Sequence, residues 1–117
     1  MISIRELTLD DIETTFAYSS DFENTHYMLM VPFSTKEETK EFICKCIEEY
    51  ACEQPEYLSF AVVLDDLHIG EVFAYISEKE ADIGWIIDKR YWGKGFATQA
   101  AKLLIEYLKE SLRIEEL

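Results

Sequence analysis

Apolar and polar residues alternate in some segments of the chain and recur at helical spacing in others. Alternation and β-rich runs predict strands over residues 2–7, 57–64, 68–77 and 81–87. Apolar positions three and four residues apart predict helices over residues 8–19, 34–50 and about 96–112. The order β-α-α-β-β-β-α, with the last three strands as an antiparallel meander, predicts an α+β (α/β) domain. We expect a mixed, mostly antiparallel sheet with flanking helices.

The first two helices carry N-terminal capping signals. Thr8 is predicted to cap the first helix, with Asp10 and Asp11 in its first turn, where carboxylates suit the helix dipole. Ser34, with Glu37 three residues later, predicts a capping box for the second helix. These signals place both helix starts from local chemistry alone.

Composition limits the classes of partner. The chain has 117 residues, a length that corresponds to a single domain over 1–117, and a net charge of −13. That charge argues against nucleic acid and against an anionic membrane surface as partners. Residues 1–78 hold 17 acids and 4 bases, whereas residues 79–117 hold 7 of each. The excess of acidic residues in the first part of the chain either serves solubility or attracts a cationic partner to that part.

No segment of the sequence indicates export or membrane insertion. No apolar run approaches the roughly 20 residues that a spanning helix needs, and residues 1–7 lack the features of a signal peptide. Cys44 and Cys46 are two residues apart on a predicted helix and face different directions, and Cys52 is the only other cysteine. We therefore expect reduced thiols, no metal site and a cytoplasmic protein.

The connection between the last strand and the last helix contains the residues that suit a ligand. Gly93 and Gly95 lie one residue apart, with Lys94 between them, and no acidic residue occurs over 91–105. The helix that follows therefore lacks a predicted cap and offers free N–H groups and a positive dipole end. This pattern predicts a phosphate site; the alternative is an ordinary glycine turn whose N–H groups meet water. A nucleotide P-loop sequence is absent, and Thr98 breaks the GxGxxG pattern.

Residues 91–100, Tyr-Trp-Gly-Lys-Gly-Phe-Ala-Thr-Gln-Ala, resemble the acetyl-coenzyme A motif of the GNAT superfamily of N-acetyltransferases. They are most similar to the branch of ribosomal-protein alanine N-acetyltransferases (RimJ/RimL-like). The family pattern Gln/Arg-x-x-Gly-x-Gly/Ala falls on Trp92, Gly95 and Ala97, where Trp92 replaces the usual Gln or Arg. Residues 83–88 and 4–11 resemble the strand before the motif and the first strand and helix of these enzymes.

The resemblance implies acetyl-CoA as cofactor and a set of residues that contact it. Backbone amides after Trp92 would hold the pyrophosphate, and the pantetheine arm would pair with the main chain of the preceding strand. Basic side chains in and before the turn, Lys94 and Arg90, would add positive charge. The cofactor-binding residues expected on this basis are Ile86, Ile87, Trp92, Gly93, Lys94, Gly95, Phe96, Ala97 and Thr98.

The resemblance also implies direct attack by a primary amine, on a protein N-terminus or a small molecule, so a general base is expected. Asp82 and Glu71 are the candidate catalytic residues, with the alternative that each is a surface or structural residue. His68 is interpreted as an exposed strand-end residue, and His26 has no assigned role. The irregular segment 20–33 contains the apolar residues Tyr27, Met28 and Phe33. We expect them either to contact the acceptor substrate or to pack under the sheet.

Members of the family usually continue beyond the position equivalent to Leu117 with another strand, a helix and a strand pair. The residue that protonates the leaving thiolate commonly lies there, so this chain offers no residue for that role. A C-terminally shortened domain would leave apolar surface and a strand edge exposed, and a homodimer is expected to cover them. Two alternatives to the enzyme stay open, a non-catalytic coenzyme A-binding module and a structural partner protein.

Overall fold

The computed structural model describes residues 1–20, 35–78 and 80–111. The strands in this part of the chain are β1 (Ile2–Glu6), β2 (Tyr57–Leu64), β3 (Leu67–Ser77) and β4 (Glu80–Ile87). The helices are α1 (Ile12–Ser19), α3 (Lys36–Tyr50) and α4 (Phe96–Ser111), with 3-10 turns η1 (Leu9–Asp11) and η3 (Lys89–Tyr91). The predicted α+β class and element order are confirmed. Each predicted strand boundary lies within one residue of the observed one.

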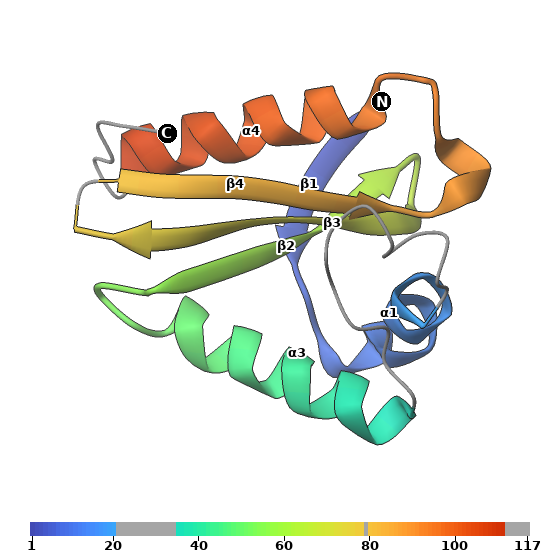
Figure 1. The fold of residues 1–117 in the computed structure, drawn as a ribbon, viewed down its shortest axis with the longest axis horizontal. Coiled ribbons are helices and arrows are strands. Elements are labelled where there is room, and N and C mark those ends of the chain that lie inside the picture. Colours follow the sequence, from blue (N-terminus) through green and yellow to red (C-terminus); the bar gives the residue numbers. More distant parts are fainter. Residues whose placement is uncertain (21–34, 79, 112–117) are drawn as a thin grey trace.

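The four strands form one antiparallel sheet in the order β1-β2-β3-β4. Figure 1 shows the sheet between two helical layers, with α4 on one face and α1 and α3 on the other. β4 is an edge strand, and its outer side pairs with no strand of the described residues. This arrangement places the edge of β4 next to the connection that leads into α4.

The core on the α4 side comes from residues at helical spacing on α4 and alternate residues of the strands. Ala100, Leu104 and Leu108 are fully buried and lie four residues apart, so they form one stripe along the helix. They pack with strand residues that include Leu58, Phe60, Val62, Val72 and Ala74. This apolar stripe is what docks α4 on the sheet.

The core on the opposite face is smaller and includes polar groups. Its buried apolar residues are Leu7, Ile43, Cys46, Ala61 and Val63. The Tyr50 hydroxyl accepts a hydrogen bond of 2.9 Å from the Leu7 N–H and donates to the Ser59 carbonyl oxygen. Tyr50 therefore ties α3 to the end of β1 and to β2.

The helix starts test the capping predictions. The Thr8 hydroxyl accepts from the Asp10 N–H at 3.3 Å, and the Thr8 N–H donates to the Asp11 carboxylate at 2.8 Å. Thr8 therefore caps the 3-10 turn η1 that leads into α1, while Asp11, the N-cap of α1 itself, makes no side-chain cap bond. The second helix is capped by Thr35, whose hydroxyl accepts from the Glu38 N–H at 3.2 Å. The prediction of a box from Ser34 and Glu37 was one residue early, because Thr35 has the extended backbone of a cap; Ser34 itself lies outside the described residues.

Candidate functional site

The connection from β4 to α4 begins with a short, internally bonded turn. The Asp88 carboxylate caps η3 by accepting from the Arg90 N–H at 3.0 Å, and it also binds the Arg90 guanidinium at 3.0 and 3.1 Å. The positive charge of Arg90 is therefore balanced by Asp88. Its predicted contribution to an anion site is weakened by this pair.

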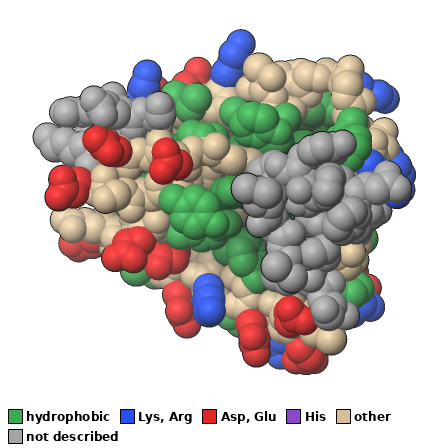
Figure 2. Space-filling view, viewed as in Figure 1, with side chains coloured by type: hydrophobic (Ala, Val, Ile, Leu, Met, Phe, Trp, Pro, Cys, Tyr) green, Lys and Arg blue, Asp and Glu red, His purple; other side chains and the backbone are tan. Residues whose placement is uncertain are grey.

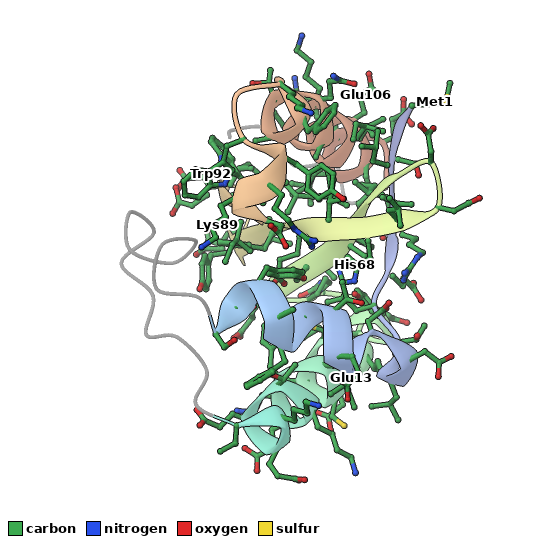
Figure 3. The ribbon with its side chains drawn as sticks, turned by 90° about the vertical axis from the view of Figure 1, so that its right-hand side faces the viewer. Met1, Glu13, His68, Lys89, Trp92 and Glu106 are labelled. Atoms are coloured by element: carbon green, nitrogen blue, oxygen red, sulfur yellow. The ribbon has the colours of Figure 1, made fainter. Side chains whose placement is uncertain are left out.

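Trp92 links this turn back to the strand. Its indole N–H donates a hydrogen bond of 2.7 Å to the Ile87 carbonyl oxygen, and its backbone N–H donates to the Lys89 carbonyl at 3.3 Å. The side chain is 46% exposed and lies beside the end of β4 (Figure 3). In the sequence, Trp92 stood out because it replaces the Gln or Arg of the family pattern. Its hydrogen bond to Ile87 was not predicted.

The two glycines of the turn both adopt left-handed backbone. Gly93 and Gly95 have φ of +78°, a conformation that residues with a side chain rarely adopt. A side-chain carbon at either position would meet no protein atom within 4 Å. Glycine is therefore required by backbone conformation, and the space beside both residues is open.

No cap for the N-terminus of α4 is found in the part of the chain that the structure describes. Within the described residues, no acceptor is found for the backbone N–H groups of residues 93–98, and the first helical bond is from the Gln99 N–H to the Gly95 carbonyl at 3.2 Å. The first turn of α4 contains no acidic residue. The unengaged N–H groups, together with the exposed Lys94, are the geometry that a phosphate group needs.

The edge of β4 is the second part of the candidate site. The Asp88 N–H donates to the Ile69 carbonyl of β3 at 2.8 Å. Because backbone groups on a strand alternate in direction, those of Ile86 point to β3 and those of Ile87 point to the open edge. The predicted pairing of pantetheine around these two residues therefore depends on Ile87, whose carbonyl oxygen also accepts from Trp92.

Glu71 is buried between the sheet and the helices α1 and α3. It is 2% exposed and accepts a hydrogen bond of 2.6 Å from the Ser59 hydroxyl. Burial raises the pKa of Glu71 to about 7, against the hydrogen bonds of Ser59 and Tyr18, which favour the carboxylate. A carboxyl that titrates near neutral pH suits proton transfer.

Asp82 lies elsewhere on β4. It is exposed and pairs across the strands with Tyr75, whereas Glu71 pairs with Ile86. The two candidate bases are therefore about four residues apart along the strands, on the order of 13 Å. The structure does not bring them together, so at most one of them serves a given amine.

The structure contradicts one prediction about a single residue, and other predicted residues lie outside the described part of the chain. The interpretation of His68 as an exposed strand-end residue was wrong, because its side chain is only 5% exposed and packs under α1 (Figure 3). The ring of Tyr18 covers it edge-on, at 5.3 Å between ring centroids. The segment containing His26, Tyr27, Met28 and Phe33 is outside the described residues.

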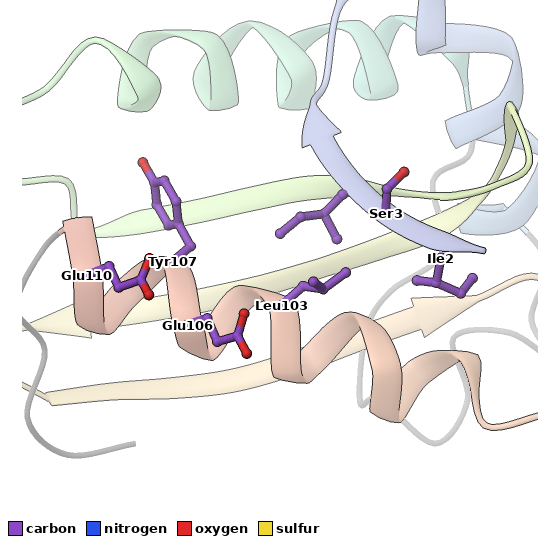
Figure 4. A pocket seen from close by; sticks show the side chains of 7 residues that line it. Ile2, Ser3, Leu103, Glu106, Tyr107 and Glu110 are labelled. Carbon is purple, nitrogen blue, oxygen red and sulfur yellow. The ribbon is translucent and has the colours of Figure 1, made fainter.

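A shallow groove of about 370 Å³ lies between β1 and the C-terminal half of α4 (Figure 4). Its lining includes Ile2, Ile4, Leu103 and Tyr107, with Glu106 and Glu110 at the side of the helix. It begins about eight residues, or on the order of 12 Å, beyond Gly95 along α4. This groove is distinct from the uncapped end of the helix.

Charged side chains of both signs lie on the surface. Figure 2 shows Asp and Glu gathered on the left and lower parts of one face, with Lys and Arg at its upper, right and lower edges. None of the described helices is both long and apolar enough to cross a membrane. No group of His, Cys, Asp and Glu in the described ranges could hold a metal ion, and Cys44, Cys46 and Cys52 are free thiols.

Comparison with known proteins places the chain in a family. The model of the acetyltransferase (GNAT) domain matches residues 2–117. The chain belongs to the GNAT acetyltransferase family. It is 31% identical over 120 residues to the uncharacterized N-acetyltransferase p20 of Bacillus licheniformis, covering 99% of this chain and 67% of that protein.

Solved GNAT structures have the same fold. A GNAT acetyltransferase from Bacillus anthracis is 26% identical with a TM-score of 0.79, over 97% of this chain and 65% of that one. The ribosomal L7/L12 α-N-protein acetyltransferase RimL, solved with coenzyme A, is 16% identical with a TM-score of 0.77, over 92% of this chain and 63% of that one. The chain thus spans about two thirds of the length of these relatives. The RimJ/RimL-like resemblance is confirmed at the level of family and fold.

Proposed function

We propose that this protein is an acetyl-CoA-dependent N-acetyltransferase that moves the acetyl group to a primary amine by direct attack. The observation that carries the proposal is the uncapped, acid-free N-terminus of α4, whose N–H groups at residues 93–98 have no acceptor among the described residues. Family membership supplies the chemistry, and RimL, a protein of the same fold, binds coenzyme A.

Each part of the site has a role in this proposal. The amides of residues 93–98 bind the pyrophosphate of acetyl-CoA, and Lys94 adds positive charge. Trp92 positions the turn against β4, and the Ile87 main chain faces the edge along which the pantetheine arm extends. The amine attacks the thioester carbonyl directly, so no covalent intermediate forms on the enzyme.

Glu71 is the preferred general base. Its pKa of about 7 allows it to accept a proton near neutral pH, and it lies across the strands from Ile86. Asp82 is the second candidate, favoured by its exposure on β4. We also propose that the acceptor is a cationic amine of a protein N-terminus or small molecule, in keeping with the acidic residues of the first part of the chain. A cytoplasmic location and a homodimer belong to the same proposal.

A non-catalytic coenzyme A-binding module is the second candidate function. The burial of Glu71 favours it, because a carboxyl group that is 2% exposed reaches an amine only after α1 or α3 moves or through a bridging water.

Titration calorimetry with acetyl-CoA tests the site, and thiol release with a panel of primary amines tests the reaction. We expect binding by the wild type and at least a tenfold weaker affinity for Gly95→Glu, which places bulk and negative charge beside the proposed pyrophosphate. Ala17→Glu adds the same charge on the exposed surface of α1 and should bind normally. Binding without thiol release supports the non-catalytic module, and absence of binding overturns both candidates.

A further inference from the structure

The outer edge of β1 carries unpaired main-chain groups. The Asp65 N–H donates to the Met1 carbonyl oxygen at 3.4 Å, so the main-chain groups at odd-numbered positions of this strand turn toward β2. Those of Ile2 and Ile4 therefore turn away from β2, and they have no hydrogen-bond partner in the part of the chain that the structure describes. The N–H and C=O groups at this edge are able to pair with a further strand.

The groove between β1 and α4 lies beside this edge (Figure 4). Ile2 and Ile4 face α4, because Ile2 is buried in the core on that side and Ile4 packs against the same core. Leu103 and the 38% exposed Tyr107 form the apolar side of the groove on the helix. A strand added to β1 would therefore place side chains in this groove, from its residues opposite Ile2 and Ile4.

The groove is also acidic. Glu106 and Glu110 line it and are exposed, and neither has an ion-pair partner within the described ranges. None of the described Lys or Arg residues lines the groove. The positive groups of β1 are engaged elsewhere, since the ammonium group of Met1 and the guanidinium of Arg5 are each paired with an aspartate. A positive group on a partner would therefore be attracted to this groove.

We propose that this edge binds an extended segment of a partner protein that carries Lys or Arg at two alternate positions. The segment pairs with the free main-chain groups of Ile2 and Ile4, and its two basic side chains enter the groove. Their aliphatic stems cover the apolar side of the groove, and their charged ends reach Glu106 and Glu110. Lys and Arg meet both requirements, because each combines an apolar stem with a positive end.

A second copy of this chain suits the edge less well. Each copy has a net charge of −13, and two-fold pairing of β1 would bring Glu106 and Glu110 of both copies to one interface. A basic segment instead lowers the charge at the interface. The candidate cofactor edge belongs to β4, at the opposite side of the sheet, so this interaction is independent of acetyl transfer.

The first experiment uses a peptide as probe and the full chain. The hexapeptide Lys-Val-Lys-Val-Lys-Val, blocked at both ends, is titrated into nitrogen-15-labelled protein and followed by NMR. We expect the amide signals of Ile2, Ile4 and residues 103–110 to move, while those of β4 stay in place. The acidic peptide Glu-Val-Glu-Val-Glu-Val should not bind. Absence of shifts at β1 with the basic peptide overturns the proposal.

Two methylated forms of the basic peptide test main-chain pairing. The lysines that enter the groove stand opposite Ile2 and Ile4, so their own backbone N–H groups face β1, whereas those of the valines face away from it. Methylation of the lysine backbone nitrogens should weaken binding at least about tenfold, and methylation of the valine backbone nitrogens should leave it within about twofold. Equal affinities of the two methylated peptides would exclude strand addition and overturn the proposal.

Paired variants of the protein test the charges of the groove. Glu106→Gln combined with Glu110→Gln should weaken binding of the basic peptide roughly three- to tenfold. Glu37→Gln combined with Glu41→Gln is the matched control, because it removes two exposed carboxylates at the same spacing on α3 and should bind normally. Equal loss in both double variants would assign the attraction to net charge alone and overturn the proposal. Sedimentation of the free protein tests the other occupant, and a dimer with β1 at its interface would show that a second copy takes the place of the basic segment.

Discussion

Gly70 of β3 and Ile86 of β4 approach so closely that no side chain fits between them. A side-chain carbon at Gly70 would collide with the Ile86 carbonyl oxygen and would lie 2.9 Å from the Ile87 Cα. Both neighbours are backbone atoms, which cannot rotate away. Gly70 therefore sets the spacing between β3 and the strand whose outer edge we assign to the cofactor.

Gly70→Ala should destabilise the protein and weaken acetyl-CoA binding together. Overpacking of this kind costs about 1–3 kcal/mol, because β4 must shift away from β3. Chemical unfolding and calorimetry measure the two effects. Gly84→Ala is the comparison, since there the added carbon meets the ring of Phe73, at 2.6 Å from its nearest atom, and a side chain can yield where a backbone cannot. Equal loss of binding in both variants would contradict a specific role of the Gly70 contact.

Gly93→Ala and Gly95→Ala should each cost about 1 kcal/mol in unfolding free energy. The cost comes from the left-handed φ of +78° and not from steric contact, because the space beside both residues is open. Asn tolerates this conformation better than a β-branched residue, so Gly93→Asn should lose less stability than Gly93→Val. Thermal unfolding measures the series, and a stability loss that follows side-chain volume instead would argue against the conformational explanation.

Trp92→Phe should loosen the turn while leaving the fold intact. The variant loses the hydrogen bond to the Ile87 carbonyl oxygen, worth about 1 kcal/mol, and we expect a several-fold weaker affinity for acetyl-CoA. Trp85→Phe is the matched control, because Trp85 is the other tryptophan, is 41% exposed, and its indole makes no hydrogen bond to the described residues. Calorimetry on both variants gives the comparison, and equal affinities would remove the assigned role of Trp92.

The contribution of Glu71 to stability should fall as pH rises from about 5 to about 7. The pKa of Glu71 in the folded protein is about 7, above its usual value of 4.5, so the native state holds this proton more tightly than the unfolded state. The contribution of Glu71 to the unfolding free energy therefore decreases across that interval, by on the order of 1–3 kcal/mol, and levels off above it. Glu71→Gln should remove most of this slope, as measured by urea unfolding at each pH. A wild-type slope that persists in Glu71→Gln would assign it to another group.

Local sequence rules predicted the elements well, because period and capping are local properties. Thr8 caps the 3-10 turn that leads into the first helix, and the second cap is Thr35 instead of Ser34, because neighbouring hydroxyl residues offer the same chemistry. The absence of acids over 91–105 predicted an uncapped α4, and among the described residues no acceptor is found for the N–H groups of residues 93–98. His68 was misjudged, because its environment comes from Tyr18 and Asp11, which are about 50 residues away along the chain.

The amino-acid sequence by itself determined the strand and helix pattern, the glycines of the turn and the missing cap of α4, since each depends on residues within one or two turns. Tertiary structure alone decided that Glu71 is buried beside Tyr18 and that Ile87 rather than Ile86 faces the open edge. These outcomes depend on strand register and on the packing of α1 over β3. Such contacts join distant segments, and no local period specifies them.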